Sequence, residues 1–187
     1  MTQTRFKPAA ELNITNEERA AFIRLMEHFR TPAAPPTVPP ERALSYLDFI
    51  RSPDMVNPTA EIRLGFNMAA VAQALELPGY NCGAVLCIGG HMSLMLEGVD
   101  VTEVATVLMT PEMMTRAGEY VTAPPDGSPK EQLFYPPEED VRSGTWSRIT
   151  PLTASYAIEN FLTTGEPAWA NALERGDQEH LAANYDD

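Results

Sequence analysis

The pattern of apolar and polar positions predicts a helix over residues 15–30. Thr15 and Glu18 form a capping-box sequence, in which each side chain satisfies a free backbone amide at the start of a helix. Apolar residues then recur at intervals of three and four, which places them on one face. Pro32 ends the helix, because proline lacks an amide hydrogen and its ring clashes with the preceding turn.

Similar signals predict a second long helix after Thr150. Thr150 suits the cap position, Pro151 suits the first helical position, and Gly165 can adopt the left-handed conformation that ends many helices. The apolar residues between them again recur by threes and fours. Pro167 then opens a last helical piece, which carries Trp169.

Shorter elements are predicted between these two helices. Start signals at Pro40, Asp100 and Thr110 each predict a short helix. Alternation of apolar and polar residues predicts at most a minor β element near residues 62–66, because a single strand has no visible partner. The alternative is a helix over residues 67–75, where several alanines favour helix formation.

Residues 83–96 are apolar on nearly every side when they are placed on a helix. A helix of this kind belongs in the interior, so the pattern predicts a central buried helix that Asn81 would cap. Gly83, Cys87 and Gly90 would share one side, where a neighbouring backbone could approach closely. In this interpretation the thiols act as small apolar groups of the core.

Together these elements predict a mainly α fold, with about seven short helices around the central helix. They form one compact domain over residues 15–175, preceded by an N-terminal arm over residues 1–14. Five of the ten residues in 31–40 are proline, which is typical of an extended connector. Residues 122–148 are predicted to be a loop, and residues 176–187 an acidic, frayed tail.

The charge of the chain excludes some classes of partner. Thirteen basic and 26 acidic residues give a formal net charge of −13, and the basic residues do not gather into a patch. Such a chain repels nucleic-acid phosphates and anionic membrane surfaces, so we expect neither partner, whereas a basic protein would suit it. The chain has no apolar stretch near the ~20 residues of a membrane span and no apolar leader. A cytoplasmic location is therefore expected.

One alternative function is that of a thiol hydrolase. Cys82 would lie at the first turn of the predicted central helix, where the helix dipole and free amides lower the pKa of a thiol. Such chemistry also needs a base. His91 lies about two turns further along the same helix and cannot reach Cys82, which leaves His180 as the candidate base.

A second alternative is a zinc-stabilised domain. Cys82, Cys87 and His91 would be its ligands, with the last two on one helical face. Structural zinc sites are usually closed by four ligands from two short-spaced pairs. Neither a fourth ligand nor a second pair is visible in the sequence.

Several short segments resemble a pattern found in bacterial and bacteriophage proteins without an assigned activity, F-(D/N)-M followed by C-G-T-x-x-C-x-x-G-(H/W). The matching segments are Phe66-Asn67-Met68, Asn81-Cys82-Gly83, Cys87-Ile88 and Gly90-His91. By pattern the match extends over roughly the C-terminal two-thirds of the chain. Ala84 departs from it, because a threonine is usual there. The resemblance implies a mostly helical domain in a microbial or phage setting, and its alternative tryptophan implies that His91 is no obligatory metal ligand.

We therefore expect a non-enzymatic, acidic, helical protein that acts through protein–protein interaction, such as a phage or mobile-element accessory factor. No cofactor is expected, and the sequence leaves the oligomeric state open. Methionine is more often core filler than part of a binding surface, although an exposed pair would suit adaptable binding. The methionines concerned are Met92, Met95, Met109, Met113 and Met114. The core or interaction residues singled out are Asn81, Cys82, Gly83, Cys87, Gly90 and His91.

Overall fold

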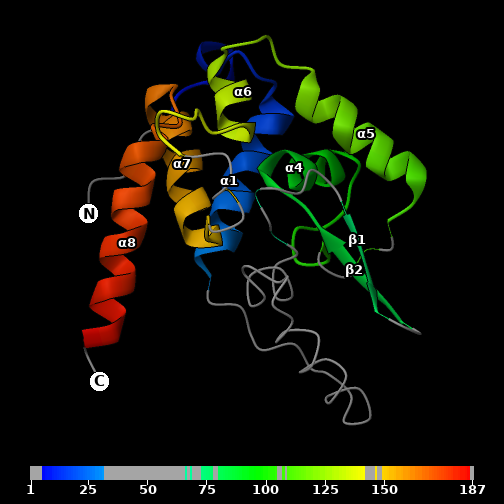
Figure 1. The fold of residues 1–187 in the computed structure, drawn as a ribbon. Coiled ribbons are helices and arrows are strands. Elements are labelled where there is room, and N and C mark those ends of the chain that lie inside the picture. Colours follow the sequence, from blue (N-terminus) through cyan, green and yellow to red (C-terminus); the bar gives the residue numbers. More distant parts are fainter. Residues whose placement is uncertain are drawn as a thin grey trace.

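A computed structural model describes residues 6–31, 66, 68, 73–77, 80–104, 107, 109–141, 146 and 149–185 of the 187-residue chain (Figure 1). The predicted mainly α fold is confirmed. In chain order, the elements of these residues are η1 (Ala9–Leu12), α1 (Asn16–Arg30), β1 (Gln73–Leu77), β2 (Tyr80–Val85), α4 (Ile88–Leu96), α5 (Pro111–Thr122), α6 (Pro129–Phe134), α7 (Pro151–Thr164) and α8 (Trp169–Tyr185).

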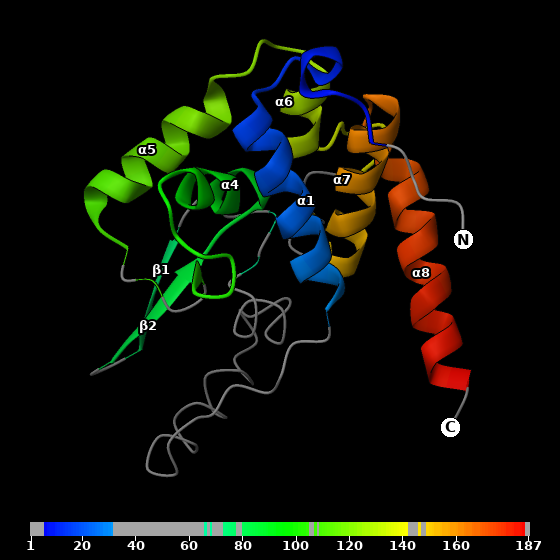
Figure 2. The same ribbon diagram turned by 180° about the vertical axis from the view of Figure 1, so that it is seen from behind.

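The larger helices lie beside one another in the order α5, α4, α1, α7, α8, as Figures 1 and 2 show from opposite sides. The short α6 packs over the α7 side of this row, and the antiparallel β1–β2 hairpin leads directly into α4. The centre of the row is the main core, where Phe22 of α1 meets Phe161 of α7 in an edge-to-face contact of 5.6 Å between ring centroids. The row therefore buries α1, α4 and α7 and leaves α5 and α8 at its two sides.

The capping signals of the sequence are confirmed at both long helices. The Glu18 amide donates to the Thr15 hydroxyl over 3.0 Å, and the Thr15 amide donates to the Glu18 carboxylate over 2.8 Å. Thr150 caps α7 by accepting a hydrogen bond from the amide of Thr153. Gly165 ends α7 in the left-handed conformation, with φ of 94°. These local signals succeed because each satisfies backbone groups within one helical turn.

The predicted buried helix over 83–96 is confirmed only from Ile88 onward. Gly83 lies in β2 and Cys87 is the N-cap of α4, so Asn81 does not cap a helix. A short apolar run suits a strand as well as a helix, and pairing with β1 satisfies the backbone of residues 80–85. The expected end at Leu96 is confirmed. Gly98, at φ of 94°, donates to the carbonyl oxygen of Met95 and Val99 donates to that of Leu94, which are the two bonds of a Schellman motif.

Other short elements differ from their predictions. Residues 73–75 lie in β1 rather than in a helix, because pairing with β2 outweighs the helix propensity of alanine. After Asp100, residues 101–103 form turns and Val104 is 3-10 helical. The Thr102 amide donates to the Asp100 carboxylate, as it would to a helix cap, but residues 105, 106 and 108 of the predicted helix lie outside the described residues. The helix predicted after Pro40 lies outside the described residues. Of residues 62–66 only Phe66 is described, in an isolated bridge to Leu86.

The remaining predictions concern the termini and the long loop. The helix predicted after Thr110 is confirmed as α5, whereas the predicted 122–148 loop contains α6, which Ser128 caps. The N-terminal arm packs on α7, where the Lys7 amide donates to the Leu162 carbonyl oxygen over 2.8 Å. The expected frayed tail continues α8 through Tyr185. In the part of the chain that the structure describes, none of the helices combines the length and apolarity that crossing a membrane requires.

Candidate functional site

The start of α4 brings together two of the residues singled out for chemistry. Cys87 is the N-cap of the helix and is 1% exposed, and His91 lies one turn further and is fully buried. Both the backbone amide and the Nδ1 atom of His91 lie 3.0 Å from the carbonyl oxygen of Cys87. Because a carbonyl oxygen only accepts, Nδ1 is protonated and donates to it. The imidazole is thereby fixed against the backbone of its own helix.

Two phenylalanine rings pack against His91. Its ring meets Phe29 edge to face, with 5.3 Å between centroids and an interplanar angle of 80°. Phe66 lies 6.1 Å away and itself packs on Phe29 with centroids 4.8 Å apart. Edge-to-face rings at such distances stabilise a core beyond the burial of their area. His91 therefore serves in the packing of α1 against α4.

Burial also governs the chemistry of Cys87. It raises the pKa of the thiol above its ordinary value of 9.0, and the amides of Gly90 and Gly89 at the helix start offset this only in part. A thiol with a raised pKa stays protonated at neutral pH, whereas nucleophilic attack and metal binding need the thiolate. In the folded chain Cys87 acts as a small apolar group.

The structure contradicts the basis of the thiol-hydrolase alternative, which was the position of Cys82 at the start of a helix. Cys82 lies in β2 and not at a helix N-terminus, because the helix begins six residues later, at Ile88. His180 lies within α8. The side chains of Asn81, Cys82 and His180 are outside the described residues, so neither their contacts nor a catalytic pairing is assigned. Gly83 is in β2, and Gly90 is buried in the first turn of α4.

A zinc site was the other alternative, with Cys82, Cys87 and His91 as ligands. Cys87 and His91 lie one helical turn apart as predicted, and the Nδ1 atom of His91 donates to a carbonyl oxygen, so Nε2 is the nitrogen that would have to bind a metal. Among the described residues, no group of three or more His, Cys, Asp and Glu side chains is placed to hold a metal ion. The side chain of Cys82 lies outside the described residues.

Gly89 is a packing residue that the sequence reasoning overlooked in favour of its neighbour Gly90. A Cβ atom placed on Gly89 would lie 2.5 Å from Cγ2 of Val121 and 3.3 Å from the Phe134 ring. The close approach predicted for this segment therefore exists, but it involves the side chains of α5 and α6. The Gly89-Gly90 pair in the sequence could have indicated this contact. Glycine weakens a helix, so a glycine within one usually allows close packing.

A second, smaller apolar cluster lies between the end of α4 and the start of α5. Its buried members are Leu86, Leu94, Val104 and Met109, and the half-buried residues packed on them are Val99, Val107, Met113 and Met114. We call these four half-buried residues the methionine surface. α5 extends sideways beyond α4, and its N-terminal half carries both methionines of this surface (Figures 1 and 2). Nearby Leu96 is 37% exposed.

Two polar clusters, one largely buried and one partly exposed, hold the helices together. In the first, the carboxylate of Glu18 accepts hydrogen bonds from the Tyr120 hydroxyl and the Lys130 ammonium group, which joins α1 to α5 and α6. Burial, together with the adjacent Glu18 charge, raises the pKa of Tyr120, so its hydroxyl stays protonated as a donor. Lys130 also lies over the Tyr120 ring, 4.5 Å from its centroid. Each polar group in this cluster has a structural partner.

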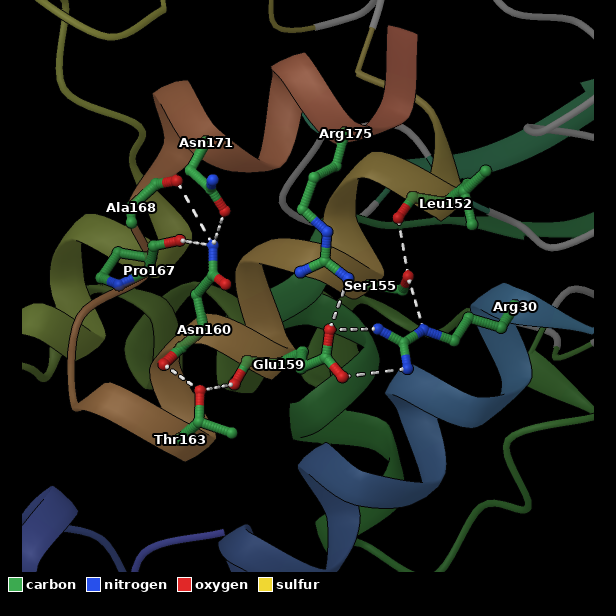
Figure 3. A network of polar contacts seen from close by, with 10 residues as sticks. All are labelled: Arg30, Leu152, Ser155, Glu159, Asn160, Thr163, Pro167, Ala168, Asn171 and Arg175. Atoms are coloured by element: carbon green, nitrogen blue, oxygen red, sulfur yellow. Dashed lines mark hydrogen bonds and ion pairs between the residues drawn. The ribbon is translucent and has the colours of Figure 1, made fainter. Parts of the chain in front are cut away.

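The second cluster joins α1, α7 and α8 around Glu159 (Figure 3). One oxygen of Glu159, Oε2, lies 2.8 Å from a guanidinium nitrogen of Arg30 and 2.8 Å from one of Arg175. Arg30 also donates to the Ser155 hydroxyl, which donates in turn to the Leu152 carbonyl oxygen. The cluster is therefore a clamp between three helices.

This clamp predicts a pH dependence of stability. Burial alone would raise the pKa of Glu159, but hydrogen bonds from Arg30 and Arg175 outweigh it and lower the pKa below 4.5. A lowered pKa in the folded state gives stability that is present above pH 4.5 and is lost as the pH falls through the folded value. We expect this contribution to be about 1 kcal/mol, because both arginines are partly exposed.

Urea unfolding between pH 7 and pH 3 measures this dependence. Glu159→Gln should lower stability at pH 7 and flatten its decline between pH 5 and pH 3. Glu139→Gln removes an exposed loop carboxylate and serves as the control, which should behave as the parent chain does. Identical pH profiles for the parent chain and Glu159→Gln would contradict the clamp.

A small cavity of about 200 Å³ lies where η1 meets the connection between α5 and α6. It is lined by Leu12, Asn13, Ala123, Pro124, Pro125, Ser128, Pro129 and Lys130. The ammonium group of Lys130 is already bound to Glu18, so this cavity offers little specific chemistry. Comparisons with protein-family models, with curated proteins and with solved structures found no match for the chain.

Proposed function

We propose that the protein is non-enzymatic and acts by binding another protein through the methionine surface. The observation that carries this proposal is the half-buried position of Met113 and Met114 on an apolar cluster separate from the main core. Methionine is flexible and polarizable, so half-buried methionines can adapt to the shape of a partner. Met92 and Met95, by contrast, are buried within the main core.

The roles of the chemically reactive residues support the same proposal. Cys87 caps a helix and has a raised pKa, and His91 is fixed by its own backbone among phenylalanine rings. These side chains contribute stability to the fold, whereas the methionine surface lies toward the outside, beyond α4. The resemblance to bacterial and bacteriophage proteins directs the search for a partner to a microbial host.

Affinity capture from the native host tests this proposal. The tagged parent chain should retain a partner that the double variant Met113→Gln/Met114→Gln loses by about tenfold or more, because glutamine keeps the length of methionine but not its apolar contact. Gln178→Ser, an exposed change on α8, is the control and should retain the partner. Circular dichroism confirms that both variants fold.

Equal retention by the parent chain and the double variant would contradict the proposal. Turnover of peptide or ester substrates by the purified chain, lost on Cys82→Ala, would contradict its non-enzymatic part.

A further inference from the structure

The stretch of chain that carries the methionine surface is rich in negative charge. Residues 94–119, which span the surface, contain five acidic residues and one basic residue, Arg116, leaving a formal charge of −4. The acidic residues are Glu97, Asp100, Glu103, Glu112 and Glu119. All five residues are exposed to solvent. We call these five residues the acidic rim. Asp100 among them also lies within electrostatic reach of Arg24 and His28 on α1. A partner that covers the methionine surface would therefore meet exposed carboxylates near an apolar centre.

The single cation of this stretch is already neutralised. Arg116 donates to Glu97 through two nitrogens, at 2.7 Å and 2.9 Å, which is the bidentate geometry of a guanidinium and a carboxylate. This pair also fixes the end of α4 beside the middle of α5. Glu112 and Glu119 are seven positions apart and so lie on one side of α5, about 100° around the helix axis from Met113. Arg116 also attracts Glu112, but one cation shared between Glu97 and Glu112 leaves the stretch negatively charged toward an external cation.

The surface offers side chains rather than a strand edge. Its methionines are on α5, whose backbone amides are bonded within the helix or to its cap: Met114 donates to the Thr110 carbonyl oxygen and Met113 to the Thr110 hydroxyl. An extended peptide would find no backbone to pair with here. A helix that presents one apolar face recognises such a surface through side chains alone.

From these observations we infer that the methionine surface binds a basic amphipathic helix, whose apolar face covers Met113 and Met114 and whose lysines or arginines meet the acidic rim. This inference rests on the proposed function and names the chemistry of its partner. A second copy of the chain would fit this surface poorly. Residues 94–119 carry a formal charge of −4 in each copy, and each whole chain carries −13, so the two copies would repel each other. Electrostatic attraction to a basic helix would also speed association.

A model peptide tests the inference with the whole chain. The probe is a fluorescein-labelled peptide of about 18 leucine and lysine residues with apolar positions at helical spacing. Its affinity is measured by fluorescence anisotropy at low and at moderate salt. A second peptide of the same composition, with its order scrambled to destroy the apolar face, shows what charge alone contributes.

Four chains are compared. Met113→Gln/Met114→Gln should weaken binding of the ordered peptide by about tenfold, and Glu112→Gln/Glu119→Gln should weaken it by about threefold to tenfold at low salt. The matched control is Glu138→Gln/Glu139→Gln, which removes the same two charges from the exposed loop after α6 and should change binding less than twofold. The scrambled peptide should bind the parent chain at least tenfold more weakly than the ordered one.

The inference is overturned if the ordered peptide does not bind, if the scrambled peptide binds as well, or if the loop control weakens binding as much as the α5 variant. Its failure is distinct from that of the proposed function. A host partner that depends on the methionines but is not displaced by the ordered peptide would keep the proposed function and overturn the basic helix. Capture that is independent of the methionines would overturn the proposed function instead.

Discussion

Replacing Gly89 by alanine should lower the free energy of unfolding by about 1–3 kcal/mol. The added methyl group would lie 2.5 Å from Cγ2 of Val121, a distance that no packed carbon atoms maintain, and 3.3 Å from the ring of Phe134. Both neighbours are buried and Val121 is β-branched, so neither can turn away without disturbing α5 or α6. Alanine normally favours a helix over glycine, which reduces the loss but does not reverse it.

Gly118→Ala is the matched control for this prediction. Gly118 is in the interior of α5, and a Cβ atom there would meet nothing within 4 Å. The same substitution should therefore stabilise the fold by about 0.5–1 kcal/mol, because only the helix propensity changes. Urea unfolding of the two variants gives opposite signs if the start of α4 is packed as described. A Gly89→Ala variant as stable as Gly118→Ala would contradict the close approach.

Trp169→Ala should lower the free energy of unfolding by about 3–5 kcal/mol, the largest loss among these substitutions. Trp169 is fully buried at the start of α8, and its Nε1 atom donates to the carbonyl oxygen of Gln132 on α6 over 2.8 Å. Truncation removes a large volume from the main core and leaves that carbonyl oxygen without its donor. Thermal unfolding should show a markedly lower midpoint, or no cooperative transition.

The second tryptophan of the chain provides a sharper comparison. Trp169→Phe keeps a ring but removes the donor, and should lower stability by about 1–2 kcal/mol. The Nε1 atom of Trp146 is buried and has no hydrogen-bond partner among the described residues. Trp146→Phe removes an unsatisfied donor and should be neutral or slightly stabilising. Equal losses for the two phenylalanine variants would show that the bond to Gln132 contributes nothing.

The elements that the sequence predicted correctly are those defined by local chemistry. Thr15, Thr150 and Gly165 act on backbone groups within a turn or two of themselves, so their pattern needs no knowledge of distant residues. The same holds for Thr110 and Pro111 at the start of α5. A helix with a capping residue at one end and a terminating residue at the other can therefore be predicted from the sequence.

The elements that were mispredicted depend on distant partners. Gly83 to Val85 form a strand because β1 lies beside them, and the apolar sequence alone cannot distinguish that strand from a helix. The Asp100 carboxylate accepts the Thr102 amide as a helix cap would, but residues 101–103 form turns, and of residues 100–104 only Val104 is helical. In the hairpin, pairing between the two strands outweighed the intrinsic helix propensity of the residues.

The candidate surface was only partly predictable. The sequence identifies the methionines, but it gives no indication that Met92 and Met95 point into the core while Met113 and Met114 remain half-buried. That difference arises because α5 extends beyond α4. The apolar pattern of the predicted central helix correctly indicated that Cys87 and His91 are buried, although the helix begins at Ile88 instead of Gly83.

The reactivity of Cys87 in a Cys82→Ser chain tests most directly whether the start of α4 is core rather than catalytic centre. The chain has two cysteines, so this variant leaves Cys87 as its single thiol. The reaction is followed at pH 7 with a disulfide reagent that releases a coloured product. The thiol of the folded protein should react at least about 100-fold more slowly than that of the protein in urea, because the core must open before Cys87 can react. Rapid, stoichiometric reaction of the folded protein would contradict the account.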